Sequence, residues 1–208
     1  MTGREYHEAL WEAVPEGLDP AWFALRRGFL LARVGAGERV LDIGCGEGRF
    51  TEALADAGAS VVGADIAEEP LRRAGARRGD LELQLIPDSG PWPFADCTFD
   101  AVWAGEVLEH VADTAGWLSE LRRVLRSGGR LHLSTPNHEA LGVMVLALSR
   151  ARFASHFDPL SDHLRFYSRR SLAGVLSELG FEEIEIEAAG GRPGARPLLL
   201  ASALRARW

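Results

Sequence analysis

An apolar segment followed by three closely spaced glycines constrains this chain more than any other stretch. Residues 39–43 form an apolar run typical of a buried parallel strand, and Gly44, Gly46 and Gly48 follow it. Residues 49–55 then have helical spacing of their apolar side chains. Because glycine has no Cβ and tolerates positive φ, such a strand–turn–helix unit lets the main chain approach a ligand closely. We expect the backbone N–H groups of the turn to surround a ligand site at the helix N-terminus.

The acid before this turn indicates which kind of ligand it accepts. Asp42 lies two residues before Gly44, where its charge would repel a diphosphate but suit a cationic group. The dinucleotide fingerprint G-x-G-x-x-G also requires a glycine at the position of Arg49. The pattern D-x-G-x-G-x-G therefore favours a positively charged ligand over a dinucleotide.

Residues 40–48 resemble the first motif of the class I S-adenosylmethionine-dependent methyltransferases. The resemblance implies an α/β, Rossmann-like fold: a doubly wound seven-stranded sheet, mostly parallel with the last strand antiparallel, and helices on both faces. It also implies S-adenosyl-L-methionine as cofactor and S-adenosyl-L-homocysteine as product. The residues expected to hold the methionine part are Asp42, Gly44, Cys45, Gly46 and Gly48.

A second apolar run, residues 59–65, ends in an acid. Asp65 lies 19 residues after Gly46, the offset at which a carboxylate can accept hydrogen bonds from ribose hydroxyls. We expect Asp65 and the adjacent Ile66 to contact an adenosine, whether it belongs to a methyltransferase cofactor or to NAD. The alternative is that Asp65 only caps the helix expected at residues 67–76.

The segment that follows the third expected strand, residues 81–86, distinguishes a methyltransferase from an NAD-binding enzyme. Asp88 and Ser89 follow it, and a Pro-Phe loop and a Phe-Asp pair lead to the fourth strand at residues 101–104. In the methyltransferase family, the acid after the third strand receives the adenine amino group. The resemblance therefore implies that Asp88 and Ser89 bind the adenine.

The segment after the fourth strand is expected to face the reacting atoms, because ligands of open parallel sheets lie beyond the carboxyl ends of the strands. Glu106 and His110 are four residues apart and would share a face in a helical turn. Glu109-His110 resembles the Glu-His pair of quinone-type and other small-molecule members of the family. We expect Glu106 to contact the cofactor and His110 to act as a base.

Residues 136–167 exceed what a minimal domain needs, and long loops in compact domains are often functional. We expect this segment to close over the methyl acceptor, with His138, His163, Arg165 and Tyr167 as substrate contacts. The alternative is an ordinary cover over the sheet with a solvated charged rim.

The rest of the chain fits one domain, residues 1–208. Residues 1–37 are expected to form a helical cover, which either shields one edge of the sheet or closes over the cofactor pocket. Residues 38–135 are expected to form the cofactor-binding core, in which Asp113 or Thr114 caps a helix over about residues 115–125 and Gly128-Gly129 precede a fifth strand at residues 130–135. We expect a short apolar helix at residues 141–148, and a last helix and a strand pair in residues 168–208.

Composition limits the other possibilities. The 23 basic residues, all arginines, and 30 acidic residues give a formal net charge of −7, which disfavours non-specific binding to nucleic acid or to an anionic membrane, although a local basic patch could still bind either. Without lysine, a P-loop and a Schiff-base mechanism are excluded. Cys45 and Cys97 lack metal-ligand spacing, and no arrangement of acids predicts a metal site. We expect a reducing, cytoplasmic location, with no export signal and no membrane span. The oligomeric state is not readable.

These observations predict a methyltransferase that transfers a methyl group to a small-molecule acceptor by in-line displacement. Two alternatives remain: an NAD-binding oxidoreductase, and a catalytically silent module that binds the cofactor for regulation or assembly.

Overall fold

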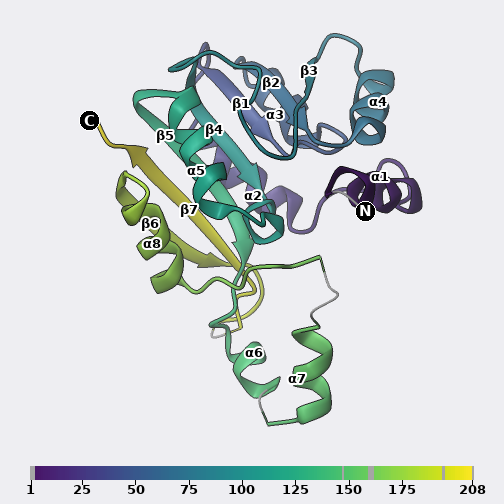
Figure 1. The fold of residues 1–208 in the computed structure, drawn as a ribbon, viewed down its shortest axis with the longest axis vertical. Helices are drawn as coiled ribbons and strands as arrows, with labels where there is room; N and C mark the ends of the chain where they lie inside the picture. The colour runs from purple at the N-terminus through teal and green to yellow at the C-terminus, as the bar shows by residue number, and fades with distance from the viewer. Residues whose placement is uncertain (1–2, 147, 159–161, 194, 208) are drawn as a thin grey trace.

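A single mixed sheet forms the centre of the protein (Figure 1). The computed structural model describes residues 3–146, 148–158, 162–193 and 195–207. Within these residues, seven strands pair in the order β3-β2-β1-β4-β5-β7-β6. The strands are β1 (Arg39–Ile43), β2 (Ser60–Asp65), β3 (Glu82–Leu85), β4 (Phe99–Gly105), β5 (Leu125–Pro136), β6 (Phe181–Ala189) and β7 (Leu198–Arg205). The first five strands are parallel, and β7 is antiparallel to both β5 and β6, which confirms the predicted fold class.

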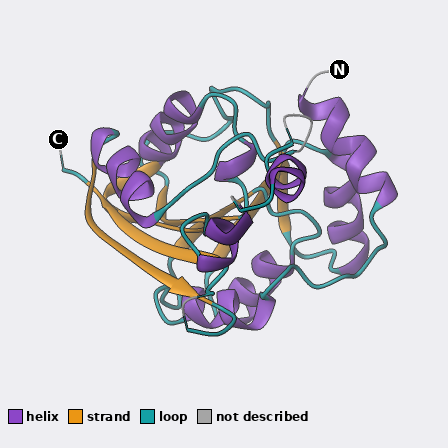
Figure 2. Cartoon of the chain, turned by 90° about the horizontal axis from the view of Figure 1, so that it is seen from below, coloured by secondary structure: helices purple, strands orange, loops and turns teal. Residues whose placement is uncertain are grey.

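Helices lie on both sides of this sheet (Figure 2). They are α1 (Gly3–Ala13), α2 (Phe23–Leu31), α3 (Arg49–Asp56), α4 (Glu68–Arg77), α5 (Thr114–Val124), α6 (Leu141–Leu146), α7 (Arg150–His156) and α8 (Arg169–Glu178), with a short 3₁₀ turn, η1 (Leu108–His110). Apolar residues of α2 and α3 pack on one face of the sheet, and those of α5 and α8 pack on the other. The alternation of side chains along each strand supplies both cores: on β4, Val102 belongs to the α5 side and Trp103 to the α2 side.

The connection from α5 to β5 differs from the expected one. Asp113 caps α5 as predicted, its side chain accepting a hydrogen bond from Gly116 N. The glycine pair that follows was expected to form a turn before a strand at residues 130–135. Instead β5 begins at Leu125, which pairs with Phe99, and the ladder resumes at Arg130 after an irregularity. Gly128, at φ +76°, supplies the backbone conformation that this irregularity requires.

The segment expected to close over the acceptor contains the helices α6 and α7, which project from the body of the molecule beyond the end of β5 (Figure 1). Residues 141–148 had been expected to be one apolar helix. The helix ends at Leu146, and residue 147 lies outside the described residues. Among the described helices, none is both long and apolar enough to cross a membrane.

Candidate active site

A cavity of about 600 Å³ lies beyond the carboxyl ends of β1, β2 and β4, where an open parallel sheet binds its ligands. Six carboxylates are among the residues that line it, together with apolar and aromatic side chains. No arginine is among the described residues of its wall. The six are Asp65, Asp88, Glu106, Asp113, Glu120 and Asp162.

Of the predicted contacts in the glycine turn, Gly44 lines this cavity, whereas Cys45, Gly46 and Gly48 do not. Gly44 N and Cys45 N both donate to Ala64 O, at 2.7 and 3.0 Å, and Gly46 N donates to Asp65 Oδ2 at 2.9 Å. The expectation that these N–H groups surround the ligand is therefore wrong for this structure, because β2 already uses them. Gly44, Gly46 and Gly48 all have positive φ, as the strand–turn–helix pattern predicts.

Asp65 connects this turn to the end of β2. Its second oxygen, Oδ1, accepts a hydrogen bond from Ala67 N at 3.0 Å. The residue is almost fully buried, and desolvation raises the pKa of its carboxyl group. Asp65 and Ile66 both line the cavity, so the position predicted for the ribose contact faces the space where a ligand would lie.

Asp42 lies beneath the turn and is not among the residues that line the cavity. Its Oδ2 accepts a hydrogen bond from Thr51 Oγ1 at 2.6 Å. Burial raises the pKa of Asp42 to about 7, although the Thr51 hydrogen bond acts in the opposite direction. Cys45 is also buried, and desolvation raises the pKa of its thiol.

The other predicted cofactor contacts lie on the wall of the cavity. Asp88 and Ser89 follow β3 and are exposed on its rim. Glu106 follows β4 with φ +59° and accepts a hydrogen bond from Ser134 Oγ at 2.9 Å. Because only residues 108–110 form η1, Glu106 and His110 do not share a helical face as expected, yet both line the cavity.

A buried arginine that the sequence pattern did not reveal lies behind these acids. Arg26 is 2% exposed, its Nη1 donates to Ala21 O, and its Nε has no hydrogen-bond partner. Burial lowers the pKa of Arg26, while Glu106 and Glu109 raise it. Its guanidinium packs over the ring of Phe50 at 4.8 Å. Arg26 is thus a counter-charge for buried carboxylates, and it had been considered only as a neighbour of apolar helix residues.

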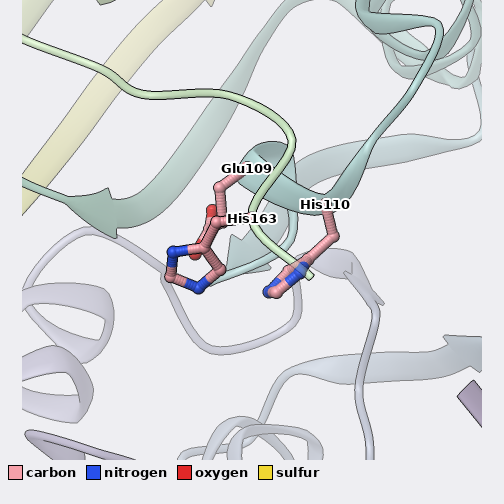
Figure 3. Close-up of side chains that lie close together, drawn as sticks. All are labelled: Glu109, His110 and His163. Carbon is pink, nitrogen blue, oxygen red and sulfur yellow. The ribbon is translucent and has the colours of Figure 1, made fainter. Parts of the chain in front are cut away.

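Glu109, His110 and His163 come together beyond the end of β4 (Figure 3). Of these three residues, only His110 lines the 600 Å³ cavity. One possible ligand atom from each lies within 4.8 Å of those of the others, and the rings of His110 and His163 are 4.9 Å apart. Glu109 Oε2 accepts a hydrogen bond from Thr135 Oγ1 at 3.0 Å, whereas Glu109 Oε1 is buried without a partner. This geometry could serve a base or hold a divalent cation, and the sequence had predicted no metal arrangement.

Burial controls the charges in this group, which we call the Glu109–His110–His163 cluster. Desolvation, and then repulsion by Glu106, raise the pKa of Glu109 to about 8. Burial lowers the pKa of His110, which keeps its imidazole neutral at physiological pH. His110 Nδ1 lies 2.9 Å from Asp162 O. If Nδ1 carries the proton and donates it to this carbonyl, Nε2 is left with a free lone pair.

The other three residues predicted to contact the acceptor lie elsewhere. His138 lines a separate cavity of about 310 Å³ beside α6, together with His156. Arg165 is exposed, and its guanidinium donates to Leu164 O and Ala112 O. Tyr167 is 5% exposed within the core. Of the residues predicted to contact the acceptor, only His163 lies beside His110. The sequence could not show this, because tertiary contacts determine the path of the loop.

Helix α1 lies over the cavity, which bears on the two roles weighed for the N-terminal segment. His7, Leu10 and Trp11 all line the cavity wall. The indole of Trp11 lies against the glycine turn so closely that a Cβ on Gly46 would come within 2.8 Å of it. The geometry thus favours the role in which α1 covers the pocket over the role in which it only shields an edge of the sheet.

Comparison with known proteins agrees with this geometry. A family model described as a methyltransferase domain matches residues 17–186. A ubiquinone biosynthesis O-methyltransferase of Pseudomonas aeruginosa is 36% identical over 171 residues, covering 78% of this chain and 72% of that protein. A 27-O-demethylrifamycin SV methyltransferase of Amycolatopsis mediterranei is 36% identical over 142 residues, covering 64% and 52%. The chain spans between about half and three quarters of the length of these relatives.

A solved structure has the same fold. The Burkholderia thailandensis 1,6-didemethyltoxoflavin-N1-methyltransferase, with S-adenosylhomocysteine bound, aligns with a TM-score of 0.70 at 19% identity, covering 98% of this chain and 84% of that one. The fold, the cavity beyond the strand ends and the family match define an enzyme that has a Rossmann-like fold and binds a nucleoside-containing cofactor. The chain belongs to the class I S-adenosylmethionine-dependent methyltransferases.

Proposed function

We propose that this protein methylates a small-molecule acceptor at the Glu109–His110–His163 cluster. The observation that carries the proposal is the wall of the 600 Å³ cavity, which has six carboxylates and, among its described residues, no arginine. Such a wall attracts a sulfonium and an ammonium group and repels a diphosphate. When bound, S-adenosyl-L-methionine supplies an already activated methyl group.

The protein's own residues divide the binding of this cofactor between them. Asp65 would accept hydrogen bonds from the ribose hydroxyls, with Ile66 beside it, and Asp88 and Ser89 would contact the adenine. Gly44, Cys45, Gly46 and Gly48 would make room for the methionine part. Asp42 and Glu106 would balance its cationic groups. The support for these roles is that Gly44, Asp65, Ile66, Asp88, Ser89 and Glu106 line the same cavity.

The chemical contribution of the protein is positioning, followed by removal of a proton. An in-line transfer needs the acceptor atom about 3 Å from the methyl carbon, in line with the bond that breaks. A hydroxyl acceptor must also lose its proton, which a neutral His110 could accept at Nε2. His163 and Glu109 would orient the acceptor beside it. Relatives named as O-methyltransferases support an oxygen acceptor.

The competing functions have less support. An NAD-binding oxidoreductase would have to place a diphosphate against acids and a turn whose N–H groups are already bonded within the protein. A silent binding module would have no use for the Glu109–His110–His163 cluster. The cytoplasmic location and the absence of nucleic acid as a partner stay predictions.

Titration calorimetry tests the proposal directly. The purified protein should bind S-adenosylmethionine and S-adenosylhomocysteine but not NAD, and binding of NAD alone would overturn the assignment. Incubation with labelled cofactor and a metabolite extract should then label a small molecule. Binding without any transfer would favour the silent module.

A further inference from the structure

Helix α6 and the turn that follows it carry an apolar stripe that the protein does not cover. We call residues 141–157 the arm. Leu141, Met144, Val145 and Leu148 follow the spacing i, i+3, i+4, i+7 and are 58%, 63%, 46% and 85% exposed. Of the 11 exposed large hydrophobic residues in the described part of the chain, seven lie in residues 141–166. Exposed apolar side chains that gather in one segment often mark an interaction surface.

The packing of the arm on the protein does not involve this stripe. The inner side of α6 contributes Val143 and Leu146 to the small cavity beside His138. At the end of α7, the ring of Phe157 lies 4.7 Å from that of Phe153 and 4.9 Å from that of Phe166. The arm is therefore attached by other side chains than those of the stripe, which are exposed to solvent. Figure 1 shows that α6 and α7 project from the body of the molecule.

The charge of the arm is opposite to that of the whole chain. Residues 141–157 include Arg150 and Arg152 and no carboxylate, although the chain has a net charge of −7. The loop between β6 and β7, whose sequence includes Arg192 and Arg196, contributes Ala195 and Pro197 to the small cavity beside α6. That loop is tied to the end of β5 by hydrogen bonds from Asn137 N to Pro197 O and from Asn137 Nδ2 to Arg196 O. Apolar and cationic side chains thus occur together at one end of the molecule.

We propose that the arm docks on the surface of a lipid bilayer that contains anionic lipids. Helices that lie in a membrane interface combine an apolar face with arginines that meet lipid phosphates, which is the combination found on the arm. Docking would seat Leu141, Met144, Val145 and Leu148 among the acyl chains, without any spanning segment. The mouth of the active site, formed in part by the loop that follows the arm, would then lie near the lipid surface. This proposal does not depend on the identity of the acceptor.

Vesicle flotation of the full chain tests the proposal. The protein should float with vesicles of phosphatidylcholine and phosphatidylglycerol at low salt. Its binding to vesicles of phosphatidylcholine alone should be weaker by about tenfold or more. Added salt should release it, because the arginine–phosphate attraction is screened.

Paired variants separate the arm from the rest of the surface. Met144→Glu combined with Leu148→Glu should reduce flotation about tenfold or more, whereas Leu18→Glu, at another exposed leucine, should not. Arg150→Ala combined with Arg152→Ala should remove the preference for anionic lipid, whereas Arg27→Ala combined with Arg207→Ala should leave it. All of these positions are exposed, so circular dichroism and the melting temperature should match the wild type.

Two results would overturn the proposal. One is a wild-type protein that floats with neither kind of vesicle. The other is a dimer, detected by sedimentation, that Met144→Glu with Leu148→Glu dissociates while vesicle binding is absent, since the stripe would then be an interface between two copies.

Discussion

Asp65 is a buried carboxylate that has a structural role and also lines the cavity. Its two oxygens accept hydrogen bonds from Gly46 N and Ala67 N, so it joins the glycine turn to the start of α4. These two bonds leave acceptor capacity on a group that also faces the cavity. Asp65 does not cap α4, because Ala67 is the N-cap residue of that helix and the hydrogen bond from Ala67 N lies before its first turn. The contact between Asp65 and a ribose stays a prediction.

Replacement of this carboxylate should affect affinity more than folding. We expect Asp65→Asn to weaken binding of S-adenosylhomocysteine by roughly 10- to 100-fold, because a hydrogen bond to a charged group contributes about 1.5–3 kcal/mol. The melting temperature should fall by only a few degrees. Calorimetry and thermal unfolding check the two effects, with the exposed Asp56→Asn as control. An affinity equal to that of the wild type would remove Asp65 from the ribose site.

His110 should determine the acid side of the pH profile. Burial lowers its pKa, so the neutral base persists below pH 6.5, and the rate should fall only as the pH drops through the lowered value. His110→Ala should reduce kcat by about 10²–10⁴ and remove this acid limb, while His156→Ala should keep both. Stopped assays of methyl transfer across pH provide the measurement.

A chelator separates the two possible roles of the Glu109–His110–His163 cluster. If His110 acts as the base, ethylenediaminetetraacetate should leave kcat unchanged. A loss of activity that Zn²⁺ or another divalent transition-metal ion restores would instead make these side chains metal ligands, since two imidazoles and a carboxylate suit such ions.

At the scale of elements, α1 is a cover held by its edges. None of its residues is buried, yet Arg73 on α4 donates to the carbonyl oxygens of Trp11 and Val14, both at 2.8 Å. Glu8 in turn accepts hydrogen bonds from backbone N–H groups at the start of α4, Glu68 N and Glu69 N, where a carboxylate is favourable. A helix that has no buried residue and is held largely by polar contacts can open at low cost in free energy.

Trp11 should therefore contribute to retention of the ligand. We expect Trp11→Ala to weaken S-adenosylhomocysteine binding about tenfold, mainly through faster dissociation, because the indole covers the glycine turn. Stopped-flow dissociation rates check this, and Trp22→Ala, at an exposed tryptophan outside the cavity wall, is the control. Equal dissociation rates in the three proteins would make α1 a passive cover.

Local patterns predicted the elements well where each residue's neighbours in sequence decide its structure. The runs of β1, β2 and β4, and the cap of α5 at Asp113, were all legible from apolar spacing and turn residues. The start of β5 at Leu125 was not, because it depends on pairing with Phe99 across the sheet. The direction of the N–H groups of the glycine turn was missed for the same reason, since Ala64 and Asp65 of β2 accept them.

The candidate site was predicted in part. The residues at strand ends were found because topology alone brings strand ends together. Arg26 was missed because it lies on a helix far from every motif, and only burial beside Glu106 and Glu109 reveals it. The sequence could not show which of His138 and His163 lies beside His110, because the path of the chain between them depends on how α6 and α7 pack.

The buried ionisable groups of the molecule make the stability of the fold depend on pH in opposite directions. His132, in β5, is 1% exposed and neither ring nitrogen has a partner, and burial lowers its pKa to about 4. Because the unfolded chain binds this proton near pH 6.5, folding loses stability as the pH falls from 6.5 to 4. Asp42 and Glu109 act oppositely, since their raised pKa values make stability fall as the pH rises through about 7 and 8.

Comparing the free energy of unfolding of His132→Leu with that of the wild type isolates the contribution of His132. Relative to the wild type, His132→Leu should gain free energy of unfolding on going from pH 7 to pH 4, by at most about 3 kcal/mol. Urea titrations at several pH values measure this, and His156→Leu, at an exposed histidine, should follow the wild type. Parallel curves for His132→Leu and the wild type would show that His132 is protonated alike in both states.

The acidic wall of the cavity has a consequence for product departure. Methyl transfer converts a sulfonium into a neutral thioether, so the molecule inside becomes less positive by one unit while the wall stays as it was. The attraction that draws the cofactor inward is weakened at the moment of turnover, which favours exchange of the spent form for a fresh one. The preference for S-adenosylmethionine over S-adenosylhomocysteine should therefore shrink between low salt and about 1 M salt, as dissociation constants of both would show.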